Sequence, residues 1–258
     1  MYGLEAYRIQ GGSRLQGNVK TSGSKNAVLP IMAATILSDE PSILHNVPLL
    51  DDVKVMCQIL NHYGVKTRWE KKDLHIDPSG IFYAQPPVTL MQKMRGSNLV
   101  LGPLLGRFGE AELPFPGGCS IGSRPMNYHV QSLCQMGAHA EEKNGFITAR
   151  AKRLQGSEIC LDFPSVGATE NSIMAAIKAR GRTLIRNAAR EPEIVDLARY
   201  LNVIGANVKG AGSDCIEIEG VRKLKGAEYS IMYDRIEAGS FLLAGAITGG
   251  EVFVEGAN

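Results

Sequence analysis

The sequence predicts an α/β protein built from repeated units, with apolar helices inside and sheets and amphipathic helices around them. One observation is that three amphipathic helical patterns each end at a glycine, namely Gly64, Gly137 and Gly205. These glycines are about 70 residues apart, which indicates an internal repeat. A second observation is that each unit holds an alanine-rich helix without a polar face, and such a helix must be surrounded by protein. A fold of Rossmann type would instead place the sheet innermost.

The first unit follows two short extended runs, at residues 6–10 and 17–21. Its elements are expected in the order apolar helix, strand, outer helix and two strands, at residues 26–37, 42–46, 51–63, 65–70 and 73–77.

The same order of elements returns in the later units. Apolar helices are expected at residues 97–108 and 169–179, and a fourth begins near Ile236 and is followed by a strand at 251–255. The chain then ends at Asn258 without an outer helix to cover the fourth apolar helix. We therefore expect this chain to be a piece of a longer protein.

Composition excludes several classes of function. The chain has 258 residues, 44% of them hydrophobic, and a net charge of +2 without a basic block, which argues against nucleic-acid and membrane partners. No apolar run reaches the roughly 20 residues that span a bilayer, and no signal peptide is evident. The five cysteines form no Cys-x-x-Cys pair, so we expect a reducing, cytoplasmic location and neither a metal site nor a disulfide framework.

Four of the five cysteines are expected to be small core residues. Cys57 and Cys134 fall in apolar helical patterns, and Cys160 and Cys215 fall in strand-like runs. Only Cys119 has glycine neighbours and a nearby cation.

The stretch at 113–125 (LPFPGGCSIGSRP) is the expected functional loop. Its prolines and glycines exclude a regular element, and units one and three have only short links at this point. Ser123 and Pro125 predict that a helix starts here. The thiol of Cys119, five residues before Arg124, is thus expected just before a helix N-terminus, where unpaired N–H groups and the helix dipole favour an anion.

The starts of the apolar helices carry residues suited to anions and hydroxyl groups. Lys25 and Asn26 open the first helix, Arg95 opens the second, and PSVGAT at 164–169 precedes the third. A lysine at a helix start adds a cation to N–H groups that already suit phosphate, although a solvated lysine is the alternative interpretation of Lys25. If the repeat closes on itself, these helix starts meet at one anionic ligand.

Seven motifs resemble those of the UDP-N-acetylglucosamine 1-carboxyvinyltransferases in the enolpyruvyl transferase family. They occur in order over essentially the whole chain: SGSKNA at 22–27, MRGS at 94–97, LGPL at 101–104, PGGCSIGSRP at 116–125, SVGAT at 165–169, NAAREPEIVD at 187–196 and DRIEAG at 234–239.

The resemblance implies the inside-out α/β barrel of the enolpyruvyl transferases, in which two domains of three repeats each enclose the substrates. Residues 22–232 would be one complete domain. Residues 1–21 and 233–258 would belong to a second, partial domain.

The resemblance also implies transfer of the enolpyruvyl group of phosphoenolpyruvate to the 3-hydroxyl of UDP-N-acetylglucosamine, with release of phosphate and without cofactor or metal. Cys119 would be the proton donor and the target of fosfomycin. The residues implied in phosphoenolpyruvate binding are Lys25 and Arg124. Those implied in contacts with the nucleotide sugar are Asn26, Arg95, Pro125, Met126, Asn127, Tyr128, Phe163, Pro164, Ser165 and Val166.

This chain departs from the family pattern in what it lacks. A carboxylate that accepts the substrate proton and a further arginine for phosphoenolpyruvate have no counterpart here, so the chain alone is expected to be weakly active or inactive. Gly96 and Pro164 replace residues found in some relatives and are interpreted as tolerated. Glu191 and Glu193 are interpreted as capping the third outer helix, where acidic residues are favoured in the first turn, and not as catalytic residues.

Three alternatives remain open. A 5-enolpyruvylshikimate-3-phosphate synthase would share the fold and phosphoenolpyruvate, but its Gly-Asn-Ala-Gly-Thr run is absent. The chain could instead be a non-catalytic fragment that binds UDP-N-acetylglucosamine. The third reading is a redox-sensing thiol, for which no resolving cysteine lies near Cys119 in the sequence.

Overall fold

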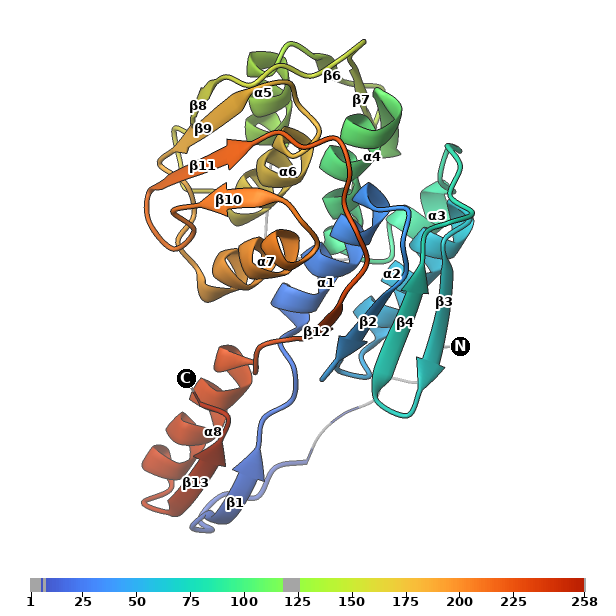
Figure 1. The fold of residues 1–258 in the computed structure, drawn as a ribbon. Helices are drawn as coiled ribbons and strands as arrows, with labels where there is room; N and C mark the ends of the chain where they lie inside the picture. Colours follow the sequence, from blue (N-terminus) through green and yellow to red (C-terminus); the bar gives the residue numbers. More distant parts are fainter. Residues whose placement is uncertain (1–5, 7, 118–125, 258) are drawn as a thin grey trace. The chain divides into compact units, whose positions relative to one another are not determined.

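The computed structural model of the chain describes residue 6 and residues 8–117 and 126–257. The chain divides into two compact units (Figure 1). The larger unit spans Gly23–Met232, and the smaller unit combines Met1–Ser22 with Tyr233–Asn258. Helices and strands are mixed in both units, so the predicted α/β class is confirmed.

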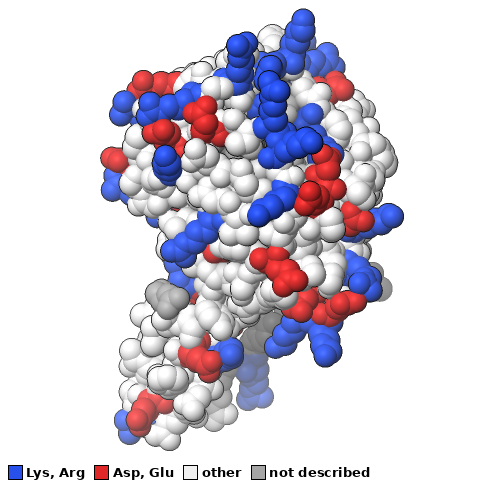
Figure 2. Space-filling model, viewed as in Figure 1, with Lys and Arg blue, Asp and Glu red and all other residues white. Residues whose placement is uncertain are grey.

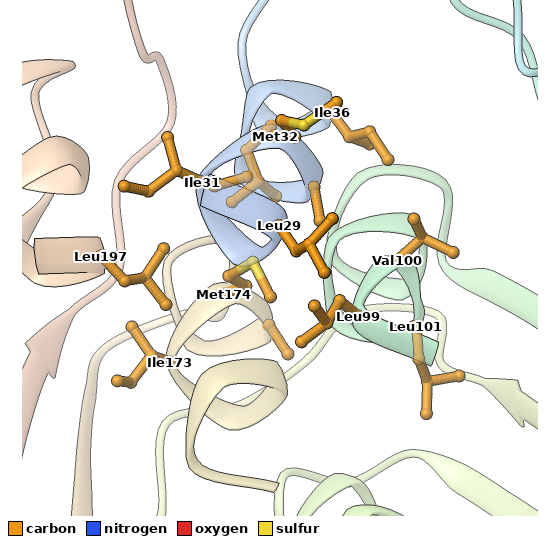
Figure 3. Packing of buried hydrophobic residues seen from close by; sticks show 14 of the residues in the cluster. Leu29, Ile31, Met32, Ile36, Leu99, Val100, Leu101, Ile173, Met174 and Leu197 are labelled. Carbon is orange, nitrogen blue, oxygen red and sulfur yellow. The ribbon is translucent and has the colours of Figure 1, made fainter. Parts of the chain in front are cut away.

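Three apolar helical segments form the interior of the larger unit. They are α1 (Lys25–Ala34) continued by η1 (Thr35–Leu37), η2 (Arg95–Val100) continued by α4 (Leu101–Phe108), and α6 (Val166–Ala176). Leu29, Leu99 and Met174, one from each segment, point into the same space (Figure 3). The predicted arrangement with helices innermost is confirmed.

The close contact between α4 and α6 depends on Gly102. A Cβ atom at this position would lie 2.2 Å from the backbone oxygen of Asn171. Any larger residue would therefore push the two helices apart, and this gives the glycine of the LGPL motif a packing role.

Amphipathic helices lie outside the apolar ones. They are α2 (Asp51–His62), α5 (Asn127–Gln135) and α7 (Pro192–Val203). Each is followed by a glycine with positive φ: 83° at Gly64, 83° at Gly137 and 104° at Gly205. Glycine adopts this left-handed conformation at little cost, so the sequence landmark of the repeat is a helix stop.

Eleven strands of the larger unit are described, in three sheets. The strands are β2 (Ser42–His45), β3 (Lys66–Glu70), β4 (Asp73–Asp77), β5 (Glu110–Pro114), β6 (His139–Lys143), β7 (Phe146–Arg150), β8 (Glu158–Cys160), β9 (Arg182–Arg186), β10 (Asn207–Lys209), β11 (Cys215–Glu219) and β12 (Glu228–Ser230). The strand orders are β12-β2-β4-β3, β5-β7-β6 and β10-β11-β9-β8. No described pairing joins one sheet to the next, so these strands surround the helices without closing a hydrogen-bonded barrel.

Each sheet repeats one arrangement of three strands. A first strand (β2, β5 or β9) leads into the outer helix, and a hairpin follows whose second strand pairs antiparallel with that first strand. Two sheets gain a parallel fourth strand, β8 beside β9 and β12 beside β2. Because β12 follows the third repeat and β2 belongs to the first, their pairing joins the two ends of the larger unit.

The smaller unit contains β1 (Gln16–Lys20), α8 (Arg235–Ile247) and β13 (Glu251–Glu255). β1 and β13 pair in parallel. Asp234 caps α8, because its Oδ1 accepts hydrogen bonds from two backbone N–H groups of the first turn at 2.8 and 3.0 Å. The predicted fourth apolar helix and its strand are thus present.

Two stretches differ from the sequence expectations. Residues 8–10, expected to be extended, belong to no strand. The second apolar helix begins as the 3₁₀ segment η2, and a short unpredicted helix, α3 (Val88–Met91), precedes it.

The prediction that Cys134 and Cys160 are core residues is wrong, because both are exposed. Cys134 follows the buried Leu133, and one residue turns a helix by about 100°, which brings Cys134 to the outer face. Cys160 follows the buried Ile159 on β8, and strand alternation puts it on the opposite face. Cys57 is buried as predicted, and Cys215 is half-buried.

Candidate active site

Lys25 and Asn26 begin α1, so the predicted cation lies at a helix N-terminus. Gly23 lets the chain enter this helix beside Asn46, because a Cβ at Gly23 would lie 1.7 Å from the Asn46 backbone oxygen. Lys25 Nζ lies 3.0 Å from Asp52 Oδ2, and the two side chains are 41% and 36% exposed. Ion pairs this open to water contribute little to stability. The Lys25 ammonium is therefore partly accessible to a ligand from solvent.

Arg95 begins η2, and its charge acts on the buried His129 of α5. Burial, and to a smaller extent the positive charge of Arg95, lowers the pKa of His129 from 6.5 to about 3. His129 is therefore neutral at pH 7. Its Nδ1 lies within hydrogen-bond distance of Asn171 Nδ2, at 3.2 Å.

Asn171, in the middle of α6, connects several elements. Its Oδ1 accepts a hydrogen bond from the Gly102 N–H at 2.7 Å, and its Nδ2 also donates to the backbone oxygens of Asn98 and Gly167, both at 3.2 Å. Asn98 in turn donates from Nδ2 to Met126 Sδ at 3.2 Å. This buried network holds the starts of η2, α5 and α6 in a fixed arrangement.

Ser165 caps α6, which begins at Val166, three residues before the start expected from the sequence. Its Oγ accepts a hydrogen bond from the Ala168 N–H at 3.4 Å, and its backbone oxygen accepts one from the Thr169 hydroxyl at 2.8 Å. A Cβ at Gly167 would lie 3.2 Å from His129 Cε1. The glycine of the SVGAT motif thus allows His129 to pack against the first turn of α6.

Tyr128 and Phe163 form a stacked aromatic pair that connects α5 with the segment before α6. Their ring centroids are 6.5 Å apart and the planes differ by 23°. Phe163 is 60% exposed. The pair presents an apolar surface next to Pro164, Ser165 and Val166.

Two buried oxygens near these helix starts lack a hydrogen-bond partner within the described part of the chain. They are Ser24 Oγ, just before α1, and Asn127 Oδ1, in the first residue of α5. Buried polar atoms are normally paired, so each of these oxygens is a candidate contact for a polar ligand or a water molecule.

The start of η2 contacts the starts of the other apolar helices. A Cβ at Gly96 would lie 3.1 Å from Leu29 Cδ1, about one helical turn beyond Lys25 in α1. Arg95 acts on His129, which packs against the first turn of α6. Lys25, Arg95 and the cap of α6 therefore lie on neighbouring helix starts.

Three predicted site residues, Cys119, Arg124 and Pro125, lie outside the described residues, as does the predicted helix start at Ser123. The described ends of this segment both lie against the region of η2. A Cβ at Gly117 would lie 2.4 Å from the Gln92 backbone oxygen, and Met126 accepts the hydrogen bond from Asn98.

Sequence reasoning missed a pair of buried carboxyl groups. Glu170 of α6 and Glu193 of α7 are 4% and 2% exposed. Burial raises the pKa of Glu170 well above its ordinary value, and the charges of Glu193 and Glu191 raise it further. Glu191 occupies the N-cap position of α7 without a side-chain capping bond, and Glu193 lies in the first turn as predicted.

Asp52 and Asn171 were also missed, and His129 was expected to be a surface or hydrogen-bonded histidine and not part of the site. His129 and Asn171 are polar residues within otherwise apolar helical patterns, and that feature was the available signal. The described residues contain no cluster of three or more His, Cys, Asp and Glu side chains arranged to hold a metal ion. None of the helices described is both long and apolar enough to cross a membrane.

The sequence profile of the EPSP synthase (3-phosphoshikimate 1-carboxyvinyltransferase) family matches residues 9–258. The chain belongs to this family. The family match agrees with the enolpyruvyl transferase fold that the motifs predict.

Curated relatives make the resemblance more specific. UDP-N-acetylglucosamine 1-carboxyvinyltransferase 1 of Carboxydothermus hydrogenoformans is 53% identical over 253 residues, which are 98% of this chain and 60% of the relative. The protein with the same name in Halalkalibacterium halodurans is 50% identical over 256 residues, 98% of this chain and 58% of the relative. The resemblance drawn from the motifs is confirmed. The chain spans about 60% of the length of these relatives.

Solved structures share the fold. The enolpyruvyl transferase NikO from Streptomyces tendae matches with a TM-score of 0.80 at 24% identity, over 91% of this chain and 56% of that protein. EPSP synthase from Acinetobacter baumannii matches with a TM-score of 0.71 at 20% identity, over 90% of this chain and 53% of that protein. The predicted enolpyruvyl transferase fold is confirmed.

Proposed function

We propose that this chain is part of an enzyme that transfers the enolpyruvyl group of phosphoenolpyruvate to the 3-hydroxyl of UDP-N-acetylglucosamine, releasing phosphate. The names of relatives 50–53% identical over 98% of the chain support this proposal. The structural observation that carries it is the group of neighbouring helix starts with Lys25, Arg95 and Ser165. Two cations and several helix N-termini in one region suit a sugar nucleotide and a phosphorylated acid. The reaction would supply precursors of peptidoglycan.

We assign the reacting groups to Lys25 and to the segment at 116–125. The enol carbon must gain a proton, the sugar hydroxyl must lose one, and phosphate must leave. In this proposal the Cys119 thiol gives the proton to the enol carbon. Lys25 and Arg124 hold the phosphate and carboxylate of phosphoenolpyruvate, since cations at a helix N-terminus stabilise charge on the leaving group.

The nucleotide sugar is assigned to the side of the site formed by η2, α5 and α6. The guanidinium of Arg95 suits a diphosphate, and the Tyr128–Phe163 pair offers flat apolar surface. Asn127 Oδ1, which has no hydrogen-bond partner among the described residues, suits a donor on the ligand. The remaining assigned contacts are Asn26, Pro125, Met126, Pro164, Ser165 and Val166.

We further propose that residues 22–232 are one complete three-repeat domain and that 1–21 and 233–258 belong to a second domain. The β12–β2 pair, which joins the first and third repeats, supports the first part. The greater length of the relatives and the exposed apolar side chains of α8 support the second. The acceptor of the substrate proton and a further arginine would then come from the rest of that domain, so the 258-residue chain is expected to turn over slowly or not at all.

We place the protein in the cytoplasm. The cysteines that the structure describes, Cys57, Cys134, Cys160 and Cys215, are all free thiols, as expected in a reducing compartment.

The test is alkylation by fosfomycin, mapped by peptide mass spectrometry on the intact chain. We expect an adduct on Cys119, because the sequence puts its thiol five residues before Arg124 and ahead of a predicted helix start, a pattern that favours a lowered thiol pKa. The exposed Cys134 and Cys160 serve as internal controls and should stay unmodified. Equal modification of these thiols, or none at Cys119, would contradict the assignment of Cys119.

A parallel assay of phosphate release from phosphoenolpyruvate separates the alternatives. Release that requires UDP-N-acetylglucosamine supports the proposed reaction, whereas release that requires shikimate 3-phosphate supports the synthase alternative. Binding of the nucleotide sugar without alkylation of Cys119 supports a non-catalytic binding fragment.

A further inference from the structure

A cavity of about 530 Å³ in the larger unit collects positive charge. It is lined by the end of α4, the segment after β7 and Lys178, which follows α6 by two positions. Five of its side chains are cationic and one is acidic: Arg107, Arg150, Lys152, Arg153 and Lys178, with Glu110. The lining thus carries a formal charge of +4, more than the +2 of the whole chain. In Figure 2, Lys and Arg side chains gather in the upper part of the view, where Figure 1 shows α4 and β7.

Backbone contacts hold the two walls of this cavity together. Gly109 ends α4 with a φ of 75°, and its carbonyl accepts a hydrogen bond from the Ala151 N–H at 2.8 Å. A Cβ at Gly109 would lie 2.8 Å from the Ala151 oxygen. Glu110 of β5 then lies opposite Arg150 of β7 in the antiparallel register of the two strands. The cationic side chains therefore extend from a defined backbone, not from a long loop.

Two of the cations are half-buried. Arg107 donates from Nη1 to the backbone oxygens of Ile36 and Ser38, both at 2.8 Å, and its Nη2 pairs with Asp39. Arg107 thus has a structural role at the end of η1. The Lys178 Nζ lies 3.4 Å from the Arg222 backbone oxygen. Burial, and then the charge of Arg107, lowers the pKa of Lys178.

Three further cations, Arg150, Lys152 and Arg153, are exposed at the rim. Within the part of the chain that the structure describes, neither these three nor Lys178 forms an ion pair with a carboxylate. These four cations repel one another, Asp39 near Lys178 and Glu110 opposite Arg150 offset part of that repulsion, and a bound anion would relieve the rest.

We propose that this cavity binds a phosphorylated small molecule that carries two or more negative charges, such as a diphosphate. Its volume is in the range of small-molecule sites, about 300–1,000 Å³. Arginine guanidinium groups match phosphate oxygens, and Leu105, Phe108 and Leu154 supply apolar wall for an organic group.

This binding site is separate from the candidate active site. Arg95 and Arg107 lie at opposite ends of η2 and α4, about 20 Å apart at ordinary helical rise. Ser165 and Lys178 are separated by a similar length of α6 and the turn after it. The two sites therefore occupy opposite ends of the same buried helices, and the inference does not depend on the proposed function.

The test is calorimetric titration of the whole chain with inorganic pyrophosphate. In the double variant Lys152→Gln/Arg153→Gln, we expect pyrophosphate binding to weaken by at least roughly tenfold, because two charges facing the ligand are lost. The matched control is Lys72→Gln/Lys209→Gln, which removes the same charge from exposed positions outside the cavity and should bind as the wild type does. Lys25→Gln separates the two sites, because the pyrophosphate binding that depends on Lys152 and Arg153 should remain in this variant.

Thermal unfolding of each variant checks that the fold is retained, and Lys178→Met provides a second loss of charge inside the cavity. Wild-type affinity in both cavity variants would overturn the proposal. So would loss of binding in Lys25→Gln alone, which would move the anion to the candidate active site, or no pyrophosphate binding by the wild type at millimolar concentration.

Discussion

Helices α1 and α8 are alike in sequence but differ in burial. Both are rich in alanine and aliphatic residues, and neither carries a charge beyond its first turn. In α1 every residue from Ala27 to Ala34 is buried, because α2, α7 and η2 pack around it. In α8 only Ala238 and Gly245 are buried. An apolar pattern therefore predicts that a helix requires packing partners. Whether the helix is buried depends on which elements pack against it.

The comparison is sharpest at two helical glycines. Gly102→Ala should destabilise the larger unit by about 3 kcal/mol or more, because the new Cβ would lie 2.2 Å from the Asn171 oxygen. Gly239→Ala in α8 meets nothing within 4 Å and should stabilise its helix by about 0.5–1 kcal/mol through better helix propensity. Urea unfolding followed by circular dichroism measures both. Equal stability of Gly102→Ala and the wild type would refute the proposed close contact of α4 and α6.

Large side chains extend the comparison. Met32→Ala in α1 should cost about 2–5 kcal/mol, because Met32 is fully buried and its loss leaves a cavity. Leu243→Ala in α8 should change stability by less than about 0.5 kcal/mol, since Leu243 is 72% exposed. The same urea titration applies. A similar cost for both variants would mean that α8 is covered in solution, for example by a second copy of the chain.

Acid should weaken the packing around the apolar helices through His129. Its pKa is about 3 in the folded chain against 6.5 for a histidine exposed to water, so between these values the unfolded chain binds the extra proton. Stability should fall by about 1.4 kcal/mol for each pH unit below 6.5. His129→Gln should remove this dependence, and the control His139→Gln, at an exposed position, should keep it. An unchanged pH profile in His129→Gln would exclude His129 as the cause.

Alkali should act in the opposite direction, through Glu170. Its raised pKa keeps the folded carboxyl protonated at pH values where the unfolded one is charged. The neutral carboxyl contributes its full share of stability below about pH 4.5. This contribution is lost as the pH rises through the pKa of Glu170 in the folded chain. Glu170→Gln should therefore be more stable than the wild type at pH 8, with a smaller difference at pH 5. Urea midpoints at the two pH values test this, and the exposed Glu219→Gln is the control.

Much of the fold could be predicted because its signals are local. The left-handed glycines after α2, α5 and α7 and the unbroken apolar run of α1 occur within single elements. Cys134 shows where such reasoning fails, since a cysteine next to a buried leucine turned out to be on the outer face of α5.

The candidate site was less predictable because it depends on distances between elements. The helix starts with Lys25, Arg95 and Ser165 could be read from local sequence. The bonds from Asn171 to His129 and Gly102 join residues far apart in the chain, and nothing in their own segments reports such a partner.

The central proposal is that the neighbouring helix starts of the larger unit form the binding site for UDP-N-acetylglucosamine. Calorimetric titration of this ligand into the chain tests it most directly, with Arg95→Gln compared against Arg68→Gln, which removes an exposed arginine of β3. The account predicts that Arg95→Gln binds at least roughly tenfold more weakly than the wild type and that Arg68→Gln binds equally well. Equal affinity in Arg95→Gln, or no binding by the wild-type chain, would contradict it.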